Sequence, residues 1–93
     1  MNVNEIQKCL SFLRIFSTFS GQIMAIHETQ VLEIILNIYE PEEFNENNEP
    51  TKFREMILIV YKNGAIDRLP ASDENRRMAN DILKKIRNSA TLK

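Results

Sequence analysis

An uninterrupted apolar run, MILIVY at positions 56–61, is followed closely by Asn63-Gly64 and constrains the fold more than any other stretch of the chain. An Asn-Gly pair after an apolar segment favours a two-residue hairpin turn, because both residues tolerate a positive φ. The same glycine is also typical of the left-handed residue that follows the last turn of a helix. The run is therefore either a strand that enters a hairpin or the end of a helix.

The residues before the run favour the helix. Pro50 stands where a first helical residue is preferred. The apolar residues then recur at the i, i+3, i+4, i+7 and i+8 positions of a helix, at Phe53, Met56, Ile57, Val60 and Tyr61. The β-branched residues within the run support a strand instead, but a strand accounts for the run alone. We predict a helix over residues 51–63.

Two more helices are predicted in the first half of the chain. Asn4 and Gln7 have the spacing of a capping box, and an amphipathic stripe follows over residues 6–16. Turn-forming residues at 17–21 interrupt this pattern. A second periodic segment over residues 26–39 ends before a Glu-Pro pair. We expect the second helix to be central, because it is apolar around most of its girth.

The second half of the chain begins with a change of composition. Residues 40–50, EPEEFNENNEP, contain five glutamates, three asparagines and two prolines, which predicts a solvated acidic loop. Residues 65–70, AIDRLP, alternate apolar and polar side chains and end in proline, which is typical of an edge strand. A last helix is predicted from Ser72, with Asp73 and Glu74 in its first turn. Its apolar stripe consists of Met78, Ile82, Leu83 and Ile86.

These elements predict one small domain over residues 1–93, mostly α with a short β element. The length and the hydrophobic content of 43% suit a modest core of this kind. The alternative fold class is α+β, with two helices, a β-hairpin at Asn63-Gly64 and a C-terminal helix. A chain this short also buries a small share of its surface, so self-association is expected.

Composition excludes several classes of protein. The longest apolar run is too short to span a membrane, and the N-terminus lacks the basic and apolar regions of a secretory signal. Cys9 is the sole cysteine, so neither an intramolecular disulfide nor a cysteine-rich zinc site can form. We therefore expect a soluble protein of a reducing compartment, the cytoplasm.

Charge divides the chain into two unlike halves. Residues 1–49 carry two basic and eight acidic side chains, for a net charge of −6. Residues 50–93 carry ten basic and five acidic side chains, for a net charge of +5. Such a split indicates either an anionic partner for the C-terminal half or complementarity between the two halves.

Several of these segments resemble the MarR-like winged helix-turn-helix family. The helix ending in KNG, the GAIDR segment at 64–68 and the charged DENRR segment at 73–77 stand in that family's order, and MAIHETQVLEII is similar to the segment before its DNA-reading unit. The resemblance spans roughly residues 20–78 and implies a winged-helix-like fold that binds DNA. The reader unit is shortened before Pro50, and the wing is truncated after Arg77.

The resemblance implies that the helix over 51–63 enters the major groove of double-stranded DNA, with flanking arginines on the backbone or in the minor groove. The candidate nucleic-acid-binding residues are Thr51, Lys52, Arg54, Arg68, Arg76 and Arg77. The alternative is that these cations pair with nearby carboxylates on a solvated surface.

We therefore predict a small DNA-binding transcriptional regulator that forms a homodimer through its terminal helices. The alternative function is a non-enzymatic protein-binding adaptor or inhibitor on the same scaffold. Such a protein would recognise a basic partner through the acidic loop 40–50.

No enzyme, metal or cofactor is predicted. His27 is the sole histidine and has no companion ligands at metal-binding spacing, so a structural role at a helix start is expected. With two glycines, Gly21 and Gly64, the chain contains no glycine-rich phosphate loop. No serine or cysteine has an obvious base beside it, and the paired glutamates lie in a polar loop.

Overall fold

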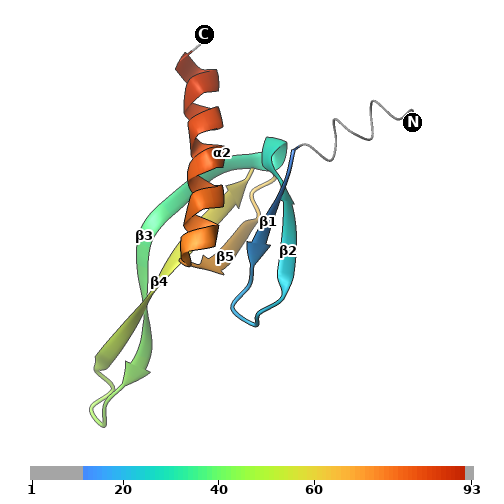
Figure 1. The fold of residues 1–93 in the computed structure, drawn as a ribbon. Coiled ribbons are helices and arrows are strands. Elements are labelled where there is room, and N and C mark those ends of the chain that lie inside the picture. Colours follow the sequence, from blue (N-terminus) through green and yellow to red (C-terminus); the bar gives the residue numbers. More distant parts are fainter. Residues whose placement is uncertain (1–11, 92–93) are drawn as a thin grey trace.

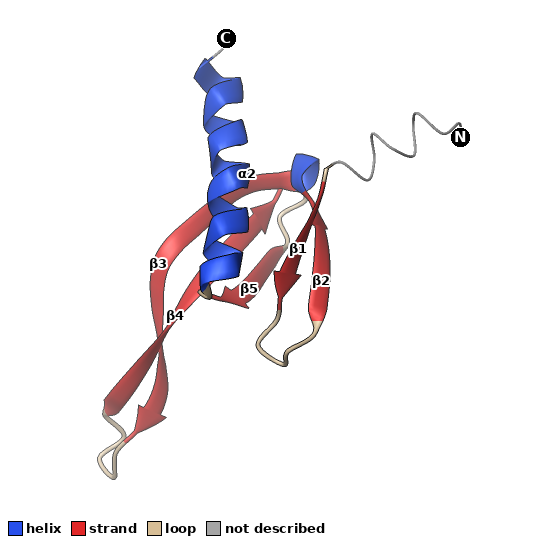
Figure 2. Cartoon of the chain, in the orientation of Figure 1, coloured by secondary structure: helices blue, strands red, loops and turns tan. Residues whose placement is uncertain are grey.

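The structure, a computed structural model, describes residues 12–91 of the chain. It is mostly β, with one long α-helix in the part that it describes (Figures 1 and 2). In chain order the elements are β1 (Leu13–Ser17), β2 (Ile23–His27), the 3₁₀ helix η1 (Glu28–Gln30), β3 (Val31–Phe44), β4 (Pro50–Tyr61), β5 (Ile66–Pro70) and α2 (Asp73–Thr91). The predicted mostly α, winged-helix-like fold class is wrong.

Two antiparallel sheets carry the fold. β1 and β2 form a hairpin, while β3, β4 and β5 form a three-stranded sheet with β4 in the centre. β3 and β4 are unusually long, with 14 and 12 residues. Their far ends therefore extend past the other elements as a two-stranded projection, seen at the lower left of Figure 1.

The core lies between α2, the β1–β2 hairpin and one face of the three-stranded sheet, which we call the inner face. Because side chains alternate along a strand, Ile57 and Ile59 of β4 share this face with Leu69 of β5. The cluster of buried apolar residues consists of Phe16, Ile26, Val31, Ile34, Ile57, Ile59, Leu69, Ala79, Ile82 and Leu83. The opposite side of the sheet, with Leu58 and Val60, is called the outer face.

The helix predicted over 51–63 is strand β4, as the alternative interpretation of the apolar run required. The run pairs with β3 on one side and with β5 on the other, from Met56 to Val60. Asn63 and Gly64 form the connection, in which Tyr61 donates its amide to the Ala65 carbonyl at 2.9 Å and Gly64 has a φ of +91°. The β-branched residues of the run are stabilised by neighbours on both sides, which outweighs the helical spacing.

The two helices predicted in the first half are also wrong where the structure describes them. Residues 13–16 of the first lie in β1, and its capping box falls in residues 1–11, outside the described part. The segment 26–39 lies in β2, η1 and β3. Register irregularities in β3 explain the false helical rhythm. They place Val31 and Ile34, three residues apart, on the same buried face, where regular alternation would separate them.

The predictions for the C-terminal part are confirmed. β5 is an edge strand that ends at Pro70, and α2 begins at Asp73. Ser72 accepts the amide proton of Asn75 at 3.2 Å, as an N-terminal helix cap does. Of the turn-forming residues 17–21, Ser17 ends β1 and residues 18–21 lie in the connection to β2, with Gly21 at a φ of +83°.

Asn75 joins α2 to two strands. Its side chain is 1% exposed, and its amide nitrogen donates to the carbonyls of Ser17 and Pro70, each at 2.9 Å. Its side-chain oxygen accepts the amide proton of Ser17 at 3.0 Å. The first turn of α2 is therefore fixed between the ends of β1 and β5.

A second polar contact lies on the inner face, where the Tyr61 hydroxyl donates to Asp67 at 2.5 Å. Burial, this hydrogen bond and the carboxylate charge all raise the pKa of Tyr61 above the ordinary value of about 10. The neutral phenol is therefore the form that the folded chain favours.

We expect Tyr61 to keep its proton at pH values where the unfolded chain loses it. The stability linked to this group is then fully present below about pH 10 and is lost as the pH rises towards the pKa of the folded state. Ultraviolet titration of a Tyr39→Phe variant, in which Tyr61 is the remaining tyrosine, measures this pKa. Asp67→Ala removes two of its three causes and should lower the midpoint. An equal midpoint in both variants would show that Asp67 has no part in it.

Candidate functional site: the projecting arm and its base

The projecting part of the β3–β4 hairpin, residues 41–53, is called the arm. Each of its residues is exposed, so no described part of the chain packs over it. Figure 2 shows the arm as the end of the molecule farthest from α2's C-terminus. A two-stranded hairpin is marginally stable alone, and here the arm is held by continuation of both strands into the three-stranded sheet.

The tip of the arm is an ordered turn. Asn45 and Glu49 close the turn with a backbone hydrogen bond of 2.9 Å, and the side chain of Asn45 accepts the amide protons of Asn47 and Glu49. Asn48 adopts a φ of +62°, which asparagine tolerates better than most residues. The asparagines of the predicted loop are therefore the residues that shape the turn, while the segments around them are strand.

Two phenylalanines project from the arm into solvent. Phe44 and Phe53 are each 54% exposed, and Tyr39 at the base is 61% exposed. Exposed aromatic side chains on a rigid element are typical anchors of protein interfaces. The sequence pattern predicted Phe44 only as part of a solvated loop and Phe53 as part of a helical stripe. The near-symmetric segments EPEEF and PTKF, on either side of an asparagine-rich turn, are the signal that could have identified them.

Charge on the arm is acidic. It contains Glu42, Glu43, Glu46 and Glu49 against Lys52, for a net charge of −3. Lys52 lies 3.6 Å from a carboxylate oxygen of Glu42 and 3.9 Å from one of Glu43. The one cation of the arm is therefore already neutralised by the carboxylates opposite it.

The predicted nucleic-acid-binding residues do not form one cationic surface. Thr51 is exposed on the arm beside Lys52. Arg54, at the base, donates two hydrogen bonds to Glu40 at 2.8 and 3.1 Å and lies over the ring of Phe19 at 4.3 Å. Arg68 lies 3.8 Å from Glu40. Lys52, Arg54 and Arg68 thus share the outer face of the sheet, where each has a carboxylate partner.

The two remaining arginines lie on α2. Arg76 pairs with Glu55 of β4 on the inner face, and Arg77 is exposed on the helix. The helix that was expected to carry Thr51, Lys52 and Arg54 into a DNA groove does not exist. Groove recognition through a helix over residues 51–63 is therefore excluded.

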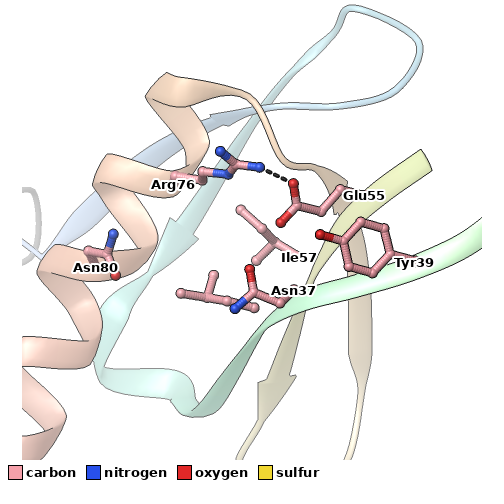
Figure 3. A pocket seen from close by; sticks show the side chains of 7 residues that line it. Asn37, Tyr39, Glu55, Ile57, Arg76 and Asn80 are labelled. Atoms are coloured by element: carbon pink, nitrogen blue, oxygen red, sulfur yellow. Dashed lines mark hydrogen bonds and ion pairs between the residues drawn. The ribbon is translucent and has the colours of Figure 1, made fainter. Parts of the chain in front are cut away.

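The Arg76–Glu55 pair forms one wall of a pocket at the base of the arm (Figure 3). The pocket has a volume of about 390 Å³ and is lined by Leu36, Asn37, Tyr39, Glu55, Ile57, Arg76 and Asn80. Asn37 adopts a φ of +62° at the register irregularity of β3, so that the strand bends here. The pocket contains hydrogen-bonding groups and an ion pair.

A second cavity, of about 470 Å³, lies between α2, η1 and the start of β3, and apolar side chains form most of its wall. Glu28 of η1 lies at its edge with its side chain 6% exposed. The carboxylate contacts Arg14 at 3.0 Å and Lys85 at 2.8 Å. Neither partner is close in sequence to Glu28, so this cluster was not anticipated.

His27 was considered as a metal ligand, and no group of potential ligands surrounds it within the described residues. His27 ends β2, where its Nδ1 lies 2.6 Å from the Thr29 hydroxyl and its ring is 5.8 Å from that of Phe12. Cys9 falls outside the described residues. Within residues 12–91, no group of three or more potential metal ligands gathers. No helix of that part is both long and apolar enough to cross a membrane.

No family model matches the chain, and no curated protein or solved structure is significantly similar to it. The comparisons therefore give no support to the MarR-like resemblance. The segments on which it depended, KNG and GAIDR, lie in a β-hairpin connection and an edge strand.

Proposed function

We propose that this chain is a non-enzymatic protein-binding module whose arm recognises a basic, partly apolar surface of a partner protein. The observation that carries the proposal is an ordered hairpin, exposed at each of its residues, that presents two phenylalanines beside an excess of carboxylates. The apolar surface of an exposed phenylalanine is removed from water only when a partner covers it, and that removal favours binding. The carboxylates favour a partner of positive charge and disfavour phosphate.

The ion pairs within the arm fit this role. Lys52 is balanced by Glu42 and Glu43, which leaves Glu46 and Glu49 at the tip without a cationic partner among the described residues. Charge at an exposed tip chiefly raises the association rate, while buried aromatic anchors slow dissociation. We therefore propose that the tip glutamates speed association with the partner and that the phenylalanines slow its dissociation.

Selection from a library of random peptides displayed on phage tests the proposal on the whole chain. Peptides that combine lysine or arginine with apolar residues should be enriched on the unaltered chain. Enrichment should be lost on a bait carrying Phe44→Ala and Phe53→Ala. For each selected peptide, either single substitution should raise the dissociation constant about tenfold or more.

Thr51→Ala is the matched control, because Thr51 is exposed on the same arm and has no aromatic ring. Circular dichroism should show equal folding of all variants. A DNA duplex of about 20 base pairs, a length that covers two helical turns, serves as the competing probe. Equal enrichment on both baits contradicts the proposal. Duplex binding with a steep salt dependence would support the DNA-binding prediction in its place.

A further inference from the structure

The outer face of the three-stranded sheet carries apolar side chains at positions where a solvated face would carry polar ones. In β4, residues 56–61 are apolar at every position, so that Leu58 and Val60 point away from the core formed by Ile57 and Ile59. A strand with apolar side chains on both sides is typical of a sheet that is covered on both faces. Here α2 covers the inner face, and the turn of the β1–β2 hairpin reaches only the end of the outer face nearest the arm, where Phe19 lies under Arg54 and Met56 is 4% exposed.

The register between the strands shows how this face is built. Cross-strand partners share a face, so three rows lie side by side on it. These rows are Glu33, Val60 and Ile66; Ile35, Leu58 and Arg68; and Ile38, Met56 and Pro70. Ile35 is 38% exposed and Ile66 is 57% exposed. Met56, in the third row, is 4% exposed, so the exposed apolar surface lies in the first two rows, which run across the full width of the sheet.

Apart from Arg54 on the central strand, which is hydrogen-bonded to Glu40, charge on this face is arranged by edge. Glu33 lies on β3 at one edge, with Glu40 farther along the same strand, whereas Arg68 lies on β5 at the other edge. The Arg68 side chain is 66% exposed, and its contact with Glu40, at 3.8 Å, is a weak surface pair. Arg68 is therefore available for a stronger partner.

We infer that a second copy of this chain covers the outer face, sheet against sheet, about a two-fold axis parallel to the strands. That rotation places β3 of each copy over β5 of the other. Arg68 of one copy then lies between Glu33 and Glu40 of its partner, and the apolar rows oppose each other as in a β-sandwich. The arrangement is self-complementary in charge and in apolar surface, as an isologous dimer requires.

This dimer differs from the one predicted through the terminal helices. The apolar stripe of α2, with Ala79, Ile82 and Leu83, is buried against the chain's own sheet. The inference also stands apart from the role proposed for the arm, since no residue of the arm takes part in it. The dimer would present two arms, one from each copy.

Analytical ultracentrifugation of the whole chain tests the inference. We expect a species of twice the 10.9 kDa chain mass. Ile66→Glu should raise the dimer dissociation constant about tenfold or more, because it places a carboxylate in the apolar rows of both copies. Leu32→Glu is the matched control. Leu32 is 56% exposed but lies beside the second cavity, on the side of α2, and its substitution should leave the dimer intact.

A charge exchange tests the orientation of the two copies. Glu33→Arg or Arg68→Glu alone should weaken the dimer about tenfold, and the two together should restore it. Circular dichroism checks that each variant is folded. A monomer at all concentrations up to about 0.1 mM overturns the inference. A dimer that Ile66→Glu leaves unchanged overturns it as well, because such a dimer would use another surface.

Discussion

Replacing Asn75 by alanine is expected to lower the free energy of unfolding by about 3–4 kcal/mol, which is a large fraction of the about 5–15 kcal/mol typical of native proteins. The substitution removes three hydrogen bonds at once, two to the carbonyls of Ser17 and Pro70 and one from the Ser17 amide. Each is worth about 1 kcal/mol when made, and more when its loss leaves a buried group without a partner. No other described side chain connects α2 to both β1 and β5 in this way.

Urea unfolding followed by circular dichroism measures this effect. Asn80→Ala is the matched control, because Asn80 lies on the same helix but is exposed, and a loss below about 0.5 kcal/mol is expected there. Asn75→Asp keeps the acceptor but loses both donors, so it should be nearly as damaging as alanine. The Ser17 amide should also exchange its hydrogen faster in both Asn75 variants. Equal stability of the Asn75→Ala and Asn80→Ala variants contradicts the assigned role.

Glu28→Gln is expected to cost about 2–4 kcal/mol, although the new side chain has nearly the same shape. The Glu28 carboxylate is the shared partner of Arg14 and Lys85, and its side chain is 6% exposed. Removing its charge leaves Arg14, whose side chain is 22% exposed, in a largely desolvated position. The cost falls at the lower end of the range if Arg14 turns towards solvent.

The two cationic partners should differ in importance. The Lys85 side chain is 53% exposed and can return to water, so Lys85→Met should cost less than about 1 kcal/mol. Arg14→Met leaves the buried carboxylate with the exposed lysine alone and should be intermediate. The expected order of destabilisation in thermal or urea unfolding is thus Glu28→Gln, Arg14→Met, Lys85→Met. Asp81→Asn, an exposed acid on α2, is the control, and a Lys85 effect as large as that of Glu28 would contradict the assigned burial.

The candidate site was only partly predictable from the sequence. The acidic and asparagine-rich composition of residues 40–50 indicated exposure and a possible protein partner, and the segment is exposed throughout except for Glu40. Its strand structure was missed, because prolines and glutamates disfavour strands and the pairing with residues 50–55 supplies what propensity lacks. Strand pairing also explains why Lys52 and Arg54 are neutralised, because each faces a glutamate that lies across the hairpin from it.

Sequence alone determined the features of this protein that depend on neighbouring residues. The start of α2 with Ser72 as its cap, the edge strand that ends at Pro70 and the turn-forming character of Asn63-Gly64 all arise from local backbone preferences. The identity of the long strands was decided by tertiary structure. A helix makes its hydrogen bonds within a few residues, whereas the apolar residues of β4 are stabilised by strands on both sides and by α2 beneath them. Register irregularities in β3 shifted the phase of its buried residues towards a helical spacing, and only the pairing with β4 resolves that ambiguity.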